Sequence, residues 1–162
     1  MSNQRIEGWW GMLGKDCTKW WIDFFKDMRS CGLYNDDDCI QIECLKFCFM
    51  HVLRDELHRA ARLWNLHRIR PSTNVESPSG RPDALFFLPE VSNTRNYMED
   101  VDFDELELAE ERCCYRPSQS GCSEEFTQLA GIIMRENSLQ FPRTAEEPGI
   151  LYITLLEEIE KM

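Results

Sequence analysis

Three groups of side chains in the sequence could take part in chemistry. The first is the carboxylate of Glu7, which follows Asn3-Gln4-Arg5-Ile6 near the start of a long apolar-patterned segment. A carboxylate can help to hold a divalent metal ion. An acidic residue in the first turn of a helix more often only complements the helix dipole. Considered without its context, Glu7 is expected to play only this structural part.

The second group is a basic corner, WNLHRIRP, which covers residues 64–71 at the expected end of a helix. The third is a run of basic and imidazole side chains before and inside that corner: Arg54, Arg59, Arg62, Arg68, Arg70, His51, His58 and His67. Arginine and lysine make most contacts with nucleic-acid phosphates. Basic residues near a helix end also commonly only compensate the dipole. Arg54 and Arg62 are expected to belong to a solvated face.

The cysteines favour a reducing compartment over a disulfide scaffold. The chain has eight, without any C-x-x-C pair, so the strongest zinc signature is missing. Cys39, Cys44 and Cys48 lie in an apolar helical pattern, where a free cysteine behaves as a small hydrophobic residue. A cysteine-bound metal is therefore not expected.

Composition indicates a globular protein. Of the 162 residues, 43% are hydrophobic and 29% are charged. No apolar run is long enough for a membrane helix, and the N-terminus has no apolar region typical of a signal peptide. We expect a soluble, intracellular protein without a membrane partner.

The net charge of −11 is unevenly distributed. Residues 1–70 contain 11 basic against 10 acidic side chains, whereas residues 71–162 contain 7 against 19. The excess negative charge therefore belongs to the second half, and the low overall pI does not argue against nucleic-acid binding by the first.

Two long helices are predicted over residues 4–31 and 36–65, because apolar residues recur every three or four positions in both. Gly32 marks the end of the first, and Asp36 to Asp38 open the second. The short connection favours an antiparallel pair.

The remainder is also expected to be helical. Residues 66–82 read as an extended loop with three prolines, and residues 82–90 are too short a segment to assign. Further helices are predicted over 104–112, 123–137 and 145–161. The fold class is mainly α.

The order of these features resembles the integrase core family of RNase H-like polynucleotidyl transferases. The motifs are Asn3-Gln4-Arg5-Ile6-Glu7, the corner over residues 64–71 and the step Gly80-Arg81-Pro82. More narrowly, the Trp-rich first helix, FCFMHV at residues 47–52 and GRPDALFFLPE at residues 80–90 are similar to uncharacterised animal integrase-core proteins. Residues 1–90 would then be the C-terminal helical part of an α/β integrase core, and residues 91–162 an acidic helical tail.

The resemblance implies a mechanism for the parent protein. In the family two Asp and one Glu hold two Mg²⁺ or Mn²⁺ ions, about 3.5–4 Å apart. Glu7 would be the catalytic and metal-binding glutamate. The two Asp lie on strands before this helix, and Asp16, Asp23 and Asp36 come after Glu7. We therefore expect this chain to be a truncated, inactive piece that binds no metal by itself.

The resemblance also implies contact with DNA. The nucleic-acid-binding candidates are Lys15, Arg59, His67, Arg68 and Arg70, and a nuclear location follows from the resemblance alone. Where retroviral integrases place lysines after the glutamate, this chain has Gly11 and Gly14, which puts contact by this helix in doubt.

An alternative is a domesticated, non-catalytic helical module that binds a protein partner. The Trp-rich first helix discriminates between the two hypotheses. A self-sufficient module should bury these Trp residues among its own helices, whereas a piece of a larger core should expose them to a missing sheet or a partner.

Overall fold

The computed structural model describes residues 4–71, 78–113, 120–142 and 147–162, with only the backbone of residues 4 and 5. Asn3 of the glutamate motif and part of the predicted 66–82 loop therefore lie outside the described residues. The helical elements are α1 (Gln4–Leu13), η1 (Gly14–Thr18), α2 (Lys19–Ser30), α3 (Cys39–Leu66), α4 (Pro82–Phe87), η2 (Pro89–Ser92), α5 (Phe103–Arg112), α6 (Glu124–Glu136) and α7 (Glu147–Glu160). The described part contains no β-strand, and the predicted mainly α fold is confirmed.

The chain forms two compact units. Unit 1 consists of Met1–His58 and Pro117–Met162, and unit 2 of Arg59–Arg116. The expected division at residue 90 concerned the origin of the sequence and stays a prediction. The compact units follow the packing, in which α6 and α7 share one core with α2 and the first part of α3.

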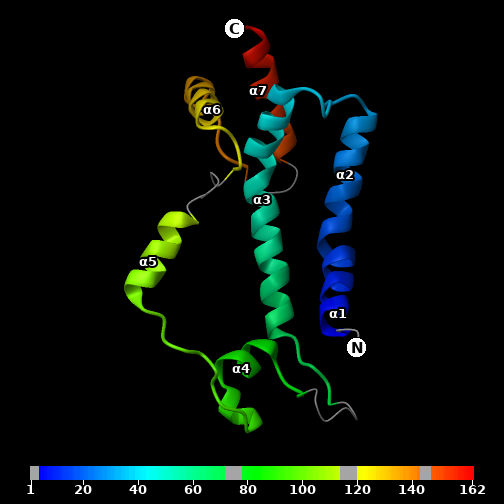
Figure 1. The fold of residues 1–162 in the computed structure, drawn as a ribbon. Helices are drawn as coiled ribbons and strands as arrows, with labels where there is room; N and C mark the ends of the chain where they lie inside the picture. The colour runs from blue at the N-terminus through cyan, green and yellow to red at the C-terminus, as the bar shows by residue number, and fades with distance from the viewer. Residues whose placement is uncertain (1–3, 72–77, 114–119, 143–146) are drawn as a thin grey trace. The chain divides into compact units, whose positions relative to one another are not determined.

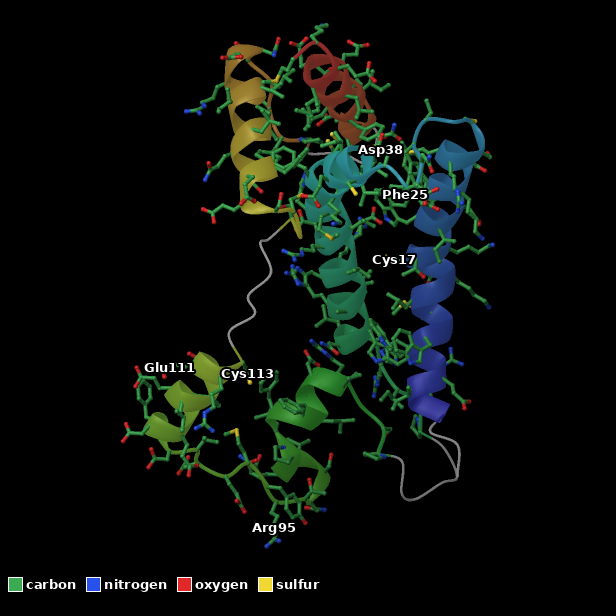
Figure 2. All side chains as sticks on the ribbon, turned by 45° about the horizontal axis from the view of Figure 1, so that its top comes forward. Cys17, Phe25, Asp38, Arg95, Glu111 and Cys113 are labelled. Atoms are coloured by element: carbon green, nitrogen blue, oxygen red, sulfur yellow. The ribbon has the colours of Figure 1, made fainter. Side chains whose placement is uncertain are left out.

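The predicted first helix is confirmed as a continuous helical segment from α1 through η1 to α2. Its middle part, η1, is a π-helical turn that contains Cys17 (Figure 2). Because a π-turn holds more residues than an α-turn, residues four positions apart stay on one face. Leu13, Cys17 and Trp21 are all buried at this spacing.

Gly32 ends α2 as predicted. Its φ is 70°, a left-handed conformation that glycine adopts without steric cost. The Leu33 amide donates to the Met28 carbonyl at 2.9 Å, and the Gly32 amide donates to the Arg29 carbonyl at 3.0 Å. This pattern is the Schellman motif, which satisfies the last carbonyls of the helix.

The second helix begins at Cys39, three residues later than the predicted start. The carboxylate of Asp38 accepts hydrogen bonds from the Ile40 and Gln41 amides at 2.9 and 3.1 Å, so Asp38 caps the helix (Figure 2). Asp36 lies before the cap and forms an ion pair with Arg29 at 2.6 Å. The aspartates therefore precede the helix instead of forming its first turn.

Helices α2 and α3 run antiparallel and side by side (Figure 1). Their contact is aromatic: the ring of Phe49 lies 6.2 Å from Trp21, 5.6 Å from Phe24 and 5.3 Å from Phe25, between centroids. Such tilted and edge-to-face pairs are favourable beyond the apolar area that they bury. The predicted antiparallel pair is thus held by one cluster of rings.

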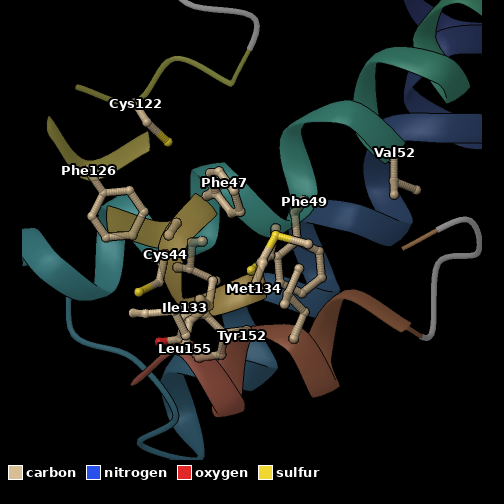
Figure 3. Packing of buried hydrophobic residues seen from close by; sticks show 14 of the residues in the cluster. Cys44, Phe47, Phe49, Val52, Cys122, Phe126, Ile133, Met134, Tyr152 and Leu155 are labelled. Carbon is tan, nitrogen blue, oxygen red and sulfur yellow. The ribbon is translucent and has the colours of Figure 1, made fainter. Parts of the chain in front are cut away.

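The two predicted C-terminal helices are present as α6 and α7. Ser123 caps α6, since its hydroxyl accepts from the Phe126 amide at 3.2 Å. Both helices bury their apolar faces against α3, and Figure 3 shows Phe126, Ile133, Met134, Tyr152 and Leu155 gathered around Cys44 and Phe47. The end of the acidic tail is therefore part of the core of unit 1.

Unit 2 contains the segment that the sequence left unassigned. Residues 82–87 form helix α4 with Pro82 in its first turn, where proline's missing N–H is no loss. Helix α5 confirms the predicted short acidic helix, and Asp102 caps it by accepting from the Asp104 amide at 2.8 Å. None of the described helices is both long and apolar enough to cross a membrane.

Candidate nucleic-acid interface

Glu7 and Lys15, the two site candidates on the first helix, are both exposed parts of unit 1. Glu7 lies in the first turn of α1, and Lys15 lies in the π-turn η1. Gly11 and Gly14 have open space where a side chain would begin, so no close backbone contact requires glycine at either position.

The described residues do not fit a two-metal site. No group of three or more His, Cys, Asp or Glu side chains lies close enough to hold an ion anywhere in the described part of the chain. A two-metal centre needs several carboxylates within a few ångströms of each other. Glu7 is a single exposed carboxylate, and no catalytic step can be derived from it here.

The basic corner and the Gly80-Arg81-Pro82 step are brought together in unit 2. The Ile69 amide donates to the Gly80 carbonyl at 2.8 Å, and the Gly80 amide donates back to the Ile69 carbonyl at 3.1 Å. The φ angle of Gly80 is 140°, which residues with a side chain rarely adopt. The Leu85 side chain also lies 3.4 Å from the position that a Cβ atom on residue 80 would occupy. The two sequence motifs are thus joined by one antiparallel bridge.

This bridge explains how Arg68 and Arg70 are displayed. In an extended segment successive side chains point to opposite sides, so the two arginines lie on the side away from Ile69. Ile69 is half-buried, whereas Arg68 and Arg70 are exposed. Arg59, on α3, is exposed as well.

His67 terminates α3. Its amide donates to the Leu63 carbonyl at 3.0 Å, and its ring Nδ1 bonds to the Trp64 carbonyl. A carbonyl only accepts, so Nδ1 carries the proton. The His67 ring also lies 4.5 Å from the Trp64 ring, between centroids. Its Nδ1 is therefore committed to the helix end, which leaves Nε2 for any contact with nucleic acid.

The basic side chains of the corner differ in their partners. Arg81 forms an ion pair with Asp83 at 2.7 Å, and this hydrogen-bonded guanidinium lowers the pKa of the Asp83 carboxyl. Arg59, Arg68 and Arg70 form no ion pair with any described residue. Their charges are thus available, whereas the charge of Arg81 is compensated.

A purely internal role for Arg68 and Arg70 would require acidic partners in the same unit, such as Asp100 or Asp102. All four residues are described, and no ion pair joins them in the structure. Asp102 instead caps α5. The geometry therefore favours the exposed role of Arg68 and Arg70.

Sequence reasoning missed one feature entirely. Arg54, expected on a solvated face, is half-buried and lines a pocket with His51 and His58. Phe141, which lies more than 80 residues later, forms another part of its wall. The sequence shows that His51, Arg54, Asp55 and His58 share one helix face, because they stand at positions i, i+3, i+4 and i+7. No neighbouring residue indicated which segment would cover that face.

Comparison with protein-family models gives one match. A family model described as integrase core domain matches residues 1–94, which is more than half of the chain and includes Glu7, the basic corner and α4. Neither a curated protein nor a solved structure matches the chain. The matched segment ends close to residue 90, where the resemblance to integrases was expected to end. This chain therefore belongs to the integrase core domain family.

Proposed function

We propose that this chain is an integrase-derived helical module that binds the DNA backbone through the corner of unit 2 and has no catalytic centre of its own. In this proposal its parent is a transposon-derived, RNase H-like integrase, in which Glu7 would be the third metal ligand. Arg59, Arg68 and Arg70 bind phosphates, and Lys15 and the free edge of His67 are secondary contacts.

One observation carries the proposal: Arg68 and Arg70 lie exposed on either side of Ile69 in the Ile69–Gly80 bridge, without an ion pair to a described residue. Exposed arginines of this kind make sequence-independent phosphate contacts. The match to integrase cores, which covers the corner, supports nucleic acid as the partner.

The acidic part of unit 2 should weaken but not abolish this binding. Helix α5 and the residues before it carry many carboxylates. Arg112 is the only basic residue within the helix. Long-range repulsion of DNA by these groups is screened at physiological salt, whereas direct phosphate contacts are retained. We therefore expect modest affinity that falls steeply with salt.

The test is fluorescence anisotropy with a labelled DNA duplex and the purified 162-residue chain, at several salt concentrations. Arg68→Ala/Arg70→Ala should weaken binding and lower the slope of log K against log salt by about two at most. The matched control is Arg95→Ala/Arg112→Ala, which removes the same charge from exposed positions of the same unit.

Three outcomes are decisive. A loss confined to the corner variant supports the proposal. Equal losses in both double variants would show that only net charge matters, and the site assignment would be wrong. Unchanged binding and salt slope with a lower melting temperature for the corner variant would make these arginines structural.

The tryptophans of the first helix bear on both hypotheses, the piece of a larger core and the protein-interaction module. Trp21 is 3% exposed within the core of unit 1, as a self-sufficient module requires. Trp10 and Trp20, however, are 61% and 53% exposed, and Ile6, about one helical turn before Trp10, is 52% exposed. Exposed aromatic side chains of this size are typical of surfaces that bind another protein.

A second copy of the chain is the simplest partner to examine. Light scattering across a range of concentrations should then show self-association that Trp10→Gln/Trp20→Gln reduces, while Phe86→Gln/Phe87→Gln on α4 leaves it unchanged. A monomer at every concentration would remove self-association from consideration.

A further inference from the structure

The proposed function does not use the pocket of unit 1, although His58 in its wall directly precedes Arg59 in the sequence. The pocket has a volume of about 520 Å³, within the usual range for small-molecule sites. One wall is a single face of α3 that carries Phe47, His51, Arg54, Asp55 and His58, and Ser120, Thr127 of α6 and Phe141 line the rest. Residues three, four and seven positions apart share a helix face, so α3 presents these groups together.

We propose that this pocket binds a ribonucleoside monophosphate, with the base on Phe141, the phosphate at Arg54 and the ribose at Asp55. The proposal concerns a free nucleotide and is independent of DNA binding by the corner. Each of the three contacts follows from a different property of the lining side chains.

The aromatic wall provides a surface for a base. The ring of Phe141 lies 5.2 Å from the ring of Phe47 and 5.7 Å from that of His51, between centroids. Phe47 is 4% exposed, whereas Phe141 is 53% exposed and keeps a free face. A base that stacks on an aromatic side chain gains about 1–3 kcal/mol.

The polar wall combines cationic, anionic and imidazole groups. Arg54 is half-buried, and neither Arg54 nor Asp55 forms an ion pair with a described residue. A guanidinium binds a phosphate in a bidentate manner. A carboxylate only accepts hydrogen bonds, so Asp55 suits the two hydroxyls of a ribose and would repel a second phosphate.

His51 adds an unmatched polar atom. Its Nε2 bonds to the Pro142 carbonyl at 2.7 Å, so Nε2 must be the donor. In the neutral ring Nδ1 is then an acceptor, and this buried atom has no hydrogen-bond partner among the described residues. An unsatisfied buried acceptor is costly. A ligand that carries an amino or hydroxyl donor, as nucleotides do, would satisfy it.

The probe is AMP, titrated into the full chain by isothermal calorimetry. AMP should bind with one site per chain, more tightly than adenosine, ribose 5-phosphate or inorganic phosphate, each of which lacks part of the ligand. Because Asp55 would bind the ribose diol, dAMP should also bind more weakly than AMP. Equal binding of inorganic phosphate and AMP, or no binding of AMP at 1 mM, would overturn the proposal.

Variants locate the site. Arg54→Gln should weaken AMP binding about tenfold or more, and Phe141→Leu should weaken it about fivefold or more. The matched controls are Arg62→Gln, an exposed arginine two turns further along α3, and Phe86→Leu, an exposed ring of unit 2. Losses in the controls equal to those in the pocket variants would overturn the proposal, provided that circular dichroism shows all four variants folded.

The pocket proposal and the proposed function can be tested separately. Arg68→Ala/Arg70→Ala changes no pocket residue, so AMP binding should survive in that variant even if DNA binding is lost. If AMP binding fails while the corner variant still lowers the DNA salt slope, the pocket proposal falls and the proposed function stands.

Discussion

The indole Nε1 of Trp21 donates a hydrogen bond to a carboxylate oxygen of Glu56 at 2.8 Å, across 35 positions of sequence. Trp21 is buried at the centre of the first helical segment, and Glu56 is half-buried on α3. The bond adds a specific polar contact between the two long helices to the aromatic rings that pack between them.

Loss of this bond should measurably destabilise unit 1. Trp21→Phe keeps an aromatic ring but leaves the Glu56 carboxylate without its donor, so we expect a loss of about 1–3 kcal/mol in the free energy of unfolding, measured by urea denaturation. Trp20→Phe, at the exposed neighbouring position, should change it by about 0.5 kcal/mol or less. Similar losses for both variants would show that Trp21 acts through ring size alone.

Helix α7 should contribute strongly to the stability of unit 1. Tyr152 is 1% exposed and donates its hydroxyl proton to the Leu33 carbonyl at 2.9 Å. Tyr152→Phe should cost about 0.5–1.5 kcal/mol, and Tyr152→Ala about 3–5 kcal/mol because a large core ring is lost. Ile153→Ala, at an exposed position, is the control. A small effect of Tyr152→Ala on urea unfolding would contradict the docking of α7.

Alkaline pH should destabilise the fold. Burial, with Cys122 nearby, raises the pKa of the Cys44 thiol from 9.0 to about 12, and burial raises the pKa of Tyr152 from 10.0 to about 12. Since both folded values lie above the unfolded ones, this stabilisation is complete below about pH 9 and is lost as pH rises toward 12.

Urea midpoints between pH 8 and pH 11 would measure this decline. In Cys44→Ala/Tyr152→Phe the decline should be shallower, although the double variant starts from a lower stability. Cys31→Ser, which removes an exposed thiol, should leave the pH dependence as it is. A midpoint that does not change over this range would show that these groups ionise as easily in the folded chain.

Replacing Gly11 by alanine should stabilise the folded chain. Nothing lies within 4 Å of the position that its Cβ would occupy, and glycine inside a helix costs about 0.5–1 kcal/mol relative to alanine. Gly11→Ala should therefore raise the melting temperature. Gly80→Ala is the opposite case, because φ of 140° is strained for alanine, and it should lower stability by about 1 kcal/mol or more.

Metal-dependent cleavage should be absent. Glu7 has no companion carboxylates that could complete a metal-binding group in the described part of the chain, and a two-metal reaction needs several. Purified chain with a labelled duplex and Mg²⁺ or Mn²⁺ should give no more product than the duplex alone. Cleavage that disappears in Glu7→Gln would refute this prediction and restore an enzymatic role.

The sequence alone was sufficient to predict the helices and most of their ends. Apolar spacing and capping act between residues a few positions apart, as at Gly32 and Ser123, so they can be read without knowledge of the fold. The start of α3 was placed too early, because acidic residues before a cap and within a first turn look alike. Helix α4 was left unassigned because six residues carry too little periodicity.

The site could be predicted in part. Glu7, Lys15 and the corner arginines were found from motif order, and their roles stay predictions. The Ile69–Gly80 bridge was not foreseen, since a pair of backbone hydrogen bonds leaves no pattern in side-chain types.

Only the tertiary structure decided which distant segments meet. The placement of α6 and α7 on α3, and the position of Phe141 over the face that carries His51 and Arg54, depend on contacts between residues 80 to 110 positions apart. Such contacts are selected by the shape and volume of the whole core and not by local spacing. For that reason the acidic tail was readable as two amphipathic helices, but its role in closing the core and forming the pocket was not.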